Sequence, residues 1–299
     1  MARWTEFARV RRPLDLAGPR GDGFLVLAAN ARLSLLTPAG GVTPFASGPG
    51  GYRSPGGEEP YIGLSPGGCY RKGVVYALRL TAGRGVVAIS ASGAVRRFTR
   101  LSVPGLIDGI TFDRTGRFGH RLLVTSNAGA RTAVEAIDCR GVVRTITRRA
   151  PRVEGGIAVA PSTFGRFAGD LIAPSETSGN VYAITPGGTS QLVANSGLPY
   201  GNDIGVESEG FVPRDPGAAA FLADRLTPGN RHPGDDVVLR ILAGELRTAG
   251  VRPGDLLVAT EGGALTDAIS CSPGACRTRL VAQGPPVAHG EGHIAFARP

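Results

Sequence analysis

The amino-acid sequence predicts an all-β fold, a β-propeller of about six four-stranded blades. The first of three observations behind this prediction is composition, because 46 Gly and 23 Pro in 299 residues that are 42% hydrophobic indicate many short apolar segments joined by tight turns. The second is a repeat of about 47 residues. The third is the order of strand-like runs, which recurs between the repeats.

The repeat rests on five segments in which an acidic or amide residue precedes a small apolar run. Each segment has an isoleucine at its centre, and these anchors are Ile62, Ile110, Ile157, Ile204 and Ile294. Their separations are 48, 47, 47 and 90 residues, the last close to two periods. A weaker copy spans 13–19, with Leu16 at the anchor position. A fixed period of this length is typical of solenoids, propellers and other repeat folds.

Four strand-like runs follow one another within each unit. The unit after Val153 contains GGIAVAP, DLIAPSE, NVYAITPGG and TSQLVAN, and the unit before it has the same order. Such runs, rich in Val, Ile, Leu and Thr and bounded by Gly, Pro, Asn or Asp, are typical of strands joined by hairpins. We therefore predict one propeller domain over 1–299, with blades at 13–48, 58–101, 105–149, 153–195, 201–247 and 252–299.

The last two blades are less regular than the first four. Between Glu209 and Gly254 the runs AAAFLADRL and DVVLRILAGEL resemble strands but lack the acidic pattern of an inner strand. We interpret this region as a fifth blade with an insertion. The sixth blade would take its inner strand from the C-terminus, HIAFARP, which would close the ring.

Acidic residues recur at the start of the predicted inner strands. Because an inner strand lines the channel, a repeated position places one side chain from each blade at the same height, where carboxylates repel one another unless a cation compensates. Carboxylate and amide oxygens suit a hard divalent cation, with calcium favoured and magnesium or zinc possible. The predicted metal ligands are Glu59, Asp108, Glu154, Asn202, Asp203 and Glu291. The alternative is that these residues only accept backbone N–H bonds in turns.

A second repeated position ends the strand that follows. It is occupied by Asn30, Asn127, Glu176 and Glu261. Glu261 and Glu176 are further candidates for the site, and turn capping is the alternative for both.

The C-terminal HGEGH carries two of the four histidines. Alternate residues of an extended strand point to one side, so His289, Glu291 and His293 are expected to share a face. Two imidazoles beside a carboxylate offer a mixed metal site or a general base, and we take His289, His293 and Glu261 as candidate catalytic residues. A hydrogen-bonded pair of turn histidines stays open as an alternative.

The net charge limits which classes of binding partner are expected. The net charge is +9, but the arginines are scattered without a long basic run, so we expect no nucleic-acid partner. The expected partner is a small-molecule substrate or ligand. No run of eighteen apolar residues exists, so no membrane-spanning helix is expected. The protein is also expected to be a monomer.

Cys271 and Cys276 could close a small disulfide loop, whereas Cys69 and Cys139 could equally be buried thiols. A mature secreted form is favoured over a cytoplasmic one.

The blade pattern resembles the six-bladed propellers of the senescence-marker and gluconolactonase group and their NHL-like relatives. This resemblance implies that Glu59, Asp108, Glu154, Asn202 and Asp203 hold a divalent ion that polarises a lactone carbonyl and activates water. Glu291-Gly-His293 and the strand end VATEGG are also similar to the streptogramin lyase propellers, whose Glu-x-His element binds magnesium and supplies a base.

We therefore expect a metal-dependent hydrolase of lactones or esters at the channel mouth, in which His289 or His293 moves protons. One alternative is a lyase that uses the same metal with His293 as its base. The other is a non-catalytic propeller that binds a ligand or protein, with calcium in a structural role.

Overall fold

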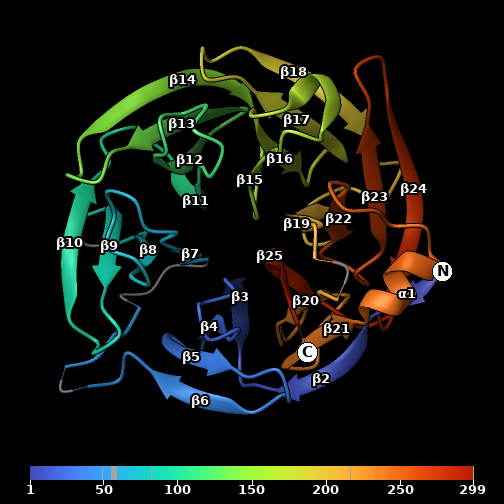
Figure 1. Ribbon diagram of the computed structural model, residues 1–299, viewed down its shortest axis with the longest axis horizontal. Helices are drawn as coiled ribbons and strands as arrows, with labels where there is room; N and C mark the ends of the chain where they lie inside the picture. The colour runs from blue at the N-terminus through green and yellow to red at the C-terminus, as the bar shows by residue number, and fades with distance from the viewer. Residues whose placement is uncertain (49, 55–58, 82, 216, 299) are drawn as a thin grey trace.

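The computed structural model of the chain describes residues 1–48, 50–54, 59–81, 83–215 and 217–298. Its strands are arranged as sheets around a central axis (Figure 1), which confirms the all-β propeller fold. Helical structure is limited to α1 (Ala243–Thr248) and the 3-10 turn η1 (Gly165–Phe167) in these ranges. No helix among these residues is long and apolar enough to cross a membrane. Glu58 and Pro299, which bound two of the predicted blades, lie outside the described residues.

Four blades are separate antiparallel sheets of four strands. The first contains β3 (Pro13–Ala17), β4 (Leu25–Ala29), β5 (Arg32–Leu36) and β6 (Val42–Phe45). The second contains β7 (Ile62–Leu64), β8 (Val75–Arg79), β9 (Gly85–Ile89) and β10 (Val95–Arg100). The third contains β11 (Leu106–Phe112), β12 (Leu122–Ala128), β13 (Arg131–Ile137) and β14 (Val143–Pro151). The fourth contains β15 (Ala158–Val159), β16 (Leu171–Ser175), β17 (Asn180–Ile184) and β18 (Ser190–Asn195).

The rest of the chain forms one nine-stranded sheet in the order β1-β24-β23-β22-β19-β25-β20-β21-β2, so the hydrogen bonding gives four separate blades instead of six. Its strands are β1 (Ala2–Arg3), β2 (Thr5–Arg9), β19 (Val206–Phe211), β20 (Ala219–Asp224), β21 (Val237–Ile241), β22 (Leu256–Thr260), β23 (Thr266–Cys271), β24 (Cys276–Gln283) and β25 (Gly290–Ala297). β19 and β25 run parallel and share a single paired position, Glu209 with His293. The sheet also contains the N-terminal strands β1 and β2 and the C-terminal strand β25, and it nearly completes the ring.

In this sheet the strands do not pair in the order in which they follow one another along the chain, as the predicted blades at 201–247 and 252–299 require. β19 pairs with β22, while β20 and β21, which directly follow β19 along the chain, lie between β25 and β2. The reason is that β20, β21 and β22 are almost entirely buried runs of small and branched apolar residues, so their patterns do not specify partners. After β19 the chain therefore crosses to the other side of β25 to form β20 and β21, and it then returns to pair β22 with β19. The N-terminal segment contributes β1 and β2, a region in which the repeat predicts no strand.

The anchors of the repeat meet at the axis. Ile62, Ile110, Ile157 and Ile294 line one central cavity of about 280 Å³, bounded by the inner strands. Ile204 does not line this cavity, and Gly210 lies there instead. The pairing of Glu209 with His293 explains this difference, because it aligns the next residue, Gly210, with Ile294.

Two disulfides tie loops of the blades. Cys69 is bonded to Cys139, with Cα atoms 5.8 Å apart, and this bond joins the second blade to the third. Cys271 is bonded to Cys276 across the turn between β23 and β24. Of the two possibilities left open for Cys69 and Cys139, the structure therefore has the disulfide and not the thiols.

Candidate functional site

A polar cavity of about 220 Å³ lies where the ends of several strands meet. It is lined by Glu59, Arg152, Glu154, Glu176, Asn202, Asp203, Glu207 and Glu261. Four of the predicted metal ligands, Glu59, Glu154, Asn202 and Asp203, are therefore brought together. Glu176 and Glu261 also reach this cavity, from the residues that directly follow β16 and β22.

Glu207 is a site residue that the sequence analysis missed. It lies three residues before Gly210, just as Glu291 lies three before Ile294. The same offset separates Glu59 from Ile62 and Glu154 from Ile157. The repeated acidic position thus includes Glu207, but the anchor isoleucine of this unit was placed at Ile204, six residues too early.

Three of these equivalent carboxylates form a first candidate metal group. Oxygens of Glu59, Glu207 and Glu291 all lie within 4.8 Å of one another. Ligands of one calcium ion, each at about 2.3–2.6 Å, are at most about 5 Å apart, so this oxygen set fits such an ion. The hydroxyl of Tyr61 lies 2.6 Å from Oε1 of Glu207 and 3.1 Å from Oε2 of Glu291, and its one proton can serve only one of them at a time.

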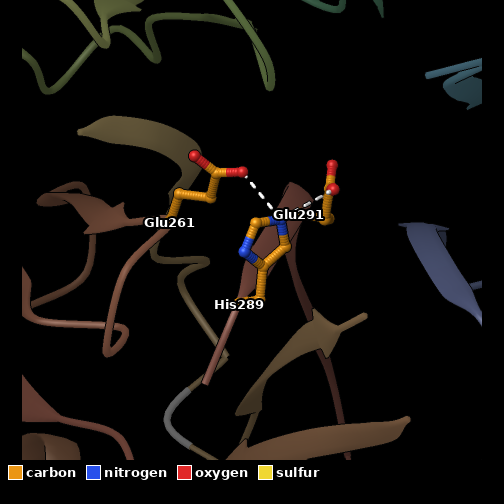
Figure 2. A group of neighbouring side chains, drawn as sticks. All are labelled: Glu261, His289 and Glu291. Atoms are coloured by element: carbon orange, nitrogen blue, oxygen red, sulfur yellow. Dashed lines mark ion pairs between the residues drawn. The ribbon is translucent and has the colours of Figure 1, made fainter. Parts of the chain in front are cut away.

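A second candidate group shares Glu291 with the first. Figure 2 shows the imidazole of His289 between Glu261 and Glu291. Its Nε2 lies 2.7 Å from Oε1 of Glu261 and 3.5 Å from Oε1 of Glu291. All three residues are buried, and Nη1 of Arg225 lies 3.1 Å from Oε1 of Glu291.

Negative charge outweighs positive charge around the two groups. The carboxylates are Glu59, Asp108, Glu154, Glu176, Asp203, Glu207, Glu261 and Glu291, and the basic groups that contact them are Arg152, Arg225 and His289. Eight carboxylates face three basic groups, so complete ionisation without another cation is unfavourable.

The pKa values reflect this crowding. Burial, followed by the charge of Glu291, raises the pKa of Glu59 well above its usual value. Burial and then the charge of Glu59 do the same to the pKa of Glu207. Burial and the charge of Glu154 raise the pKa of Glu176 to about 8. In the absence of a bound cation, Glu176 therefore retains its proton at neutral pH, and the pKa values of Glu59 and Glu207 are shifted in the same direction.

The pKa of His289 is raised, which favours the charged form of its imidazole. Burial lowers its pKa, but hydrogen bonds to Glu261 and Glu291 and their charges outweigh burial and raise the pKa to about 10. His289 is consequently an imidazolium that can donate a proton at neutral pH.

Asp108, a predicted metal ligand, is fully buried and does not line the polar cavity. Its Oδ2 accepts a hydrogen bond from Nδ2 of Asn127, and its Oδ1 accepts one from the N–H of Gly155 at 3.4 Å. Asn127 also donates to the carbonyl of Val153 at 2.7 Å. These bonds tie the start of β11 to the segment that leads into β15.

His293 lies apart from the other two residues of the HGEGH segment. Gly292 has φ +67, and this turn of the backbone interrupts the alternation of side chains in β25. His289 and Glu291 meet, whereas His293 lines the central cavity with its Nδ1 2.9 Å from Oδ1 of Asp15. The expectation that all three residues share one face is therefore wrong for His293.

Asp15 is a second residue that the sequence analysis missed. Its carboxylate is fully buried and accepts hydrogen bonds from the N–H groups of Ile62 at 2.7 Å and His293 at 2.8 Å. Because these partners belong to different inner strands, Asp15 links β3, β7 and β25. The sequence signal was present in PLDLAGP, the weak first copy of the repeat.

No protein-family profile matches the chain, and no curated protein matches it. Among solved structures, a protein of unknown function from Bacteroides thetaiotaomicron is similar with a TM-score of 0.55 at 11% identity, over 97% of this chain and 65% of that one. The chain thus spans less than two thirds of that protein's length.

A catalytically inactive histidine-to-alanine variant of virginiamycin B lyase from Staphylococcus aureus, solved with quinupristin, is similar with a TM-score of 0.50 at 14% identity, over 97% and 92% of the two chains. A gluconolactonase from Xanthomonas campestris is similar with a TM-score of 0.45 at 14% identity, over 73% and 68%. At these identities the likeness concerns the fold alone.

Proposed function

We propose that the protein is a divalent-metal-dependent hydrolase that opens lactones or related esters at the acidic mouth of its channel. The observation that carries this proposal is the convergence of oxygens from Glu59, Glu207 and Glu291 within 4.8 Å. Three carboxylates at this spacing, two of them buried and that of Glu59 half-buried, need either protons or a cation, and an all-oxygen set favours calcium.

The proposal includes six functional blades around the channel. In the nine-stranded sheet, β22, β23 and β24 extend from β19, and β20, β21 and β2 extend from β25. Only one paired position joins the two halves in the described chain. Each half therefore has the strand content of one blade, with an inner strand that contributes a carboxylate, Glu207 or Glu291.

The bound cation would polarise the ester carbonyl and lower the pKa of a water molecule. Glu59, Glu207 and Glu291 would hold it by their carboxylate oxygens. The proton lost by the attacking water would go to solvent. His289 lies beside Glu291, and the proton that its Nε2 shares with Glu261 would pass to the alcohol oxygen that leaves the acyl carbon, as the bond to Glu261 breaks. Glu261, 2.7 Å from the same nitrogen, orients the imidazole and stabilises its charge.

A lyase is the second candidate, and the pair formed by Asp15 and His293 supports it. A carboxylate bonded to Nδ1 orients an imidazole as a base. The similar fold of virginiamycin B lyase adds to this alternative. In a lyase, His293→Ala would abolish elimination from an ester substrate, whereas in the hydrolase His289→Ala would abolish ring opening.

The decisive experiment measures turnover of a lactone panel after chelation and after reloading with calcium, magnesium or zinc. We expect turnover to disappear on chelation and to return with one of these ions. Glu207→Gln should lose turnover, and Glu6→Gln, on an exposed ion pair with Arg9, should retain it. Loss of thermal stability on chelation, with no lactone or ester turned over before or after, would contradict the enzyme proposal and favour a binding protein with a structural ion.

A further inference from the structure

A large groove opens beside the acidic cavity. It encloses about 710 Å³, and we call it the side groove. Its apolar wall consists of Trp4, Pro199, Ile204, Leu265, Pro285 and Pro286. The polar side chains that line it are Arg3, Thr5, Arg231, His232 and Gln283, and no carboxylate of the described chain does so.

The side groove and the acidic cavity are lined by neighbouring residues of two chain segments. Ile204 of the groove directly follows Asp203 of the acidic cavity, and Gly262 directly follows Glu261. The N–H of Glu261 donates to the carbonyl of Gly205 at 2.7 Å, which holds these two segments side by side. A molecule bound at the carboxylates therefore has the groove as its neighbouring space.

Gly262 and His232 shape the junction. A Cβ at Gly262 would lie 2.7 Å from Cδ2 of His232, so the imidazole occupies the space that a side chain would need. Nδ1 of His232 lies 2.7 Å from the carbonyl oxygen of Pro286, which fixes the ring against the proline wall. The ring of His232 and the absence of a side chain at Gly262 thus shape the groove next to Glu261.

We propose that the side groove binds the apolar substituent of the substrate, so that the site selects cyclic esters with an alkyl or aryl chain over polyhydroxylated sugar lactones. This inference rests on the proposed hydrolase function. The hydroxyls of a sugar lactone that face the wall of Ile, Leu, Trp and Pro would lose their hydrogen-bond partners, whereas an alkyl or aryl chain has none to lose. Each buried methylene instead strengthens binding about fourfold. The arginines of the groove further disfavour a cationic substituent.

The test compares two six-membered lactones that differ in their substituents, δ-decalactone and glucono-δ-lactone, on the calcium-loaded protein. We expect kcat/KM to be at least tenfold higher for δ-decalactone. Ile204→Ser should lower the ratio of the two values at least fivefold, and Leu192→Ser, an exposed leucine of β18, should leave the ratio unchanged. Equal or higher kcat/KM for the sugar lactone would overturn the inference while leaving the hydrolase proposal intact.

Trp4 supplies a readout that does not depend on turnover. It is the only tryptophan of the sequence and lies in the groove wall with 3% of its surface exposed. In the metal-free protein we expect δ-decalactone to change its fluorescence saturably and glucono-δ-lactone to leave it unchanged. A saturable change without turnover of any lactone would support the groove and contradict the hydrolase. The absence of any change with δ-decalactone, with the sugar lactone turned over, would contradict the groove alone.

Discussion

Glu291 is the carboxylate on which the site depends most. It belongs to both candidate metal groups, and it contacts Tyr61, Arg225 and His289. Its position follows from Gly292, whose positive φ turns the backbone between Glu291 and His293. Glu291 therefore connects the two candidate metal groups with His289, the only histidine of the described residues in either group.

Glu291→Gln should weaken calcium binding at least tenfold, because the amide keeps the shape of the side chain but supplies no charge. Isothermal titration of the metal-free protein measures this effect. Glu6→Gln, an exposed residue of β2, is the matched control and should bind as the unaltered protein does. Unchanged affinity in Glu291→Gln would exclude this carboxylate as a ligand.

The sequence predicted that an acidic residue recurs three positions before each anchor residue. It predicted less well which residues occupy that position. The offset of three residues before an isoleucine identified Glu59, Glu154 and Glu291. It missed Glu207, because Gly210 replaces the isoleucine in that unit and Ile204 stood in its place. The position of His293 could not be predicted, because the alternation rule fails wherever a glycine turns the strand.

Among the elements, β19 and β25 matter most, because they join the two halves of the nine-stranded sheet. The repeat predicted strands in this region, and the C-terminal strand does take an inner position. The partners of β20 and β21 could not be predicted, because uniformly buried strands carry no alternation that marks a face or a neighbour. Pairing in this region is instead determined by packing across the whole sheet.

Gly210→Ala should destabilise the protein by about 1–3 kcal/mol, since an added methyl would overlap the carbonyl oxygen of Ile294 and force β19 and β25 apart. Gly274→Ala is the control, because nothing lies within 4 Å of a Cβ at that turn. Urea denaturation of both variants compares their free energies of unfolding. Equal stability of the two would contradict the tight approach of β19 to β25.

For the whole molecule, the propeller explains why carboxylates far apart in the sequence meet. Inner strands of the sheets reach one axis, where Ile62, Ile110, Ile157 and Ile294 line the central cavity. Carboxylates that are far apart in the sequence gather in the separate polar cavity. The 47-residue repeat made this arrangement predictable. The number of separate sheets was not predictable, because one parallel pairing between β19 and β25 merges two sets of strands.

The crowding predicts how stability depends on pH. A carboxyl whose pKa is higher in the folded than in the unfolded protein stabilises the fold at low pH, and this contribution is lost as the pH rises through the folded value. Glu176 has a pKa of about 8 and His289 one of about 10, both raised, so their contributions have the same sign. The Tm of the metal-free protein should therefore fall between pH 5 and pH 9, and calcium should raise it more at pH 8.5 than at pH 5.5. A Tm of the metal-free protein that rises over this range would contradict the assignment.

Calorimetric titration of calcium into the metal-free protein, in two pH 7 buffers of different ionisation enthalpy, tests the central claim most directly. If Glu59, Glu207 and Glu291 form one cation site, a single ion binds per chain and protons are released, because the pKa values of Glu59 and Glu207 are raised and calcium competes with protons for their oxygens. Glu207→Gln should abolish this binding. Binding that occurs without proton release, or that survives in Glu207→Gln, would contradict the account.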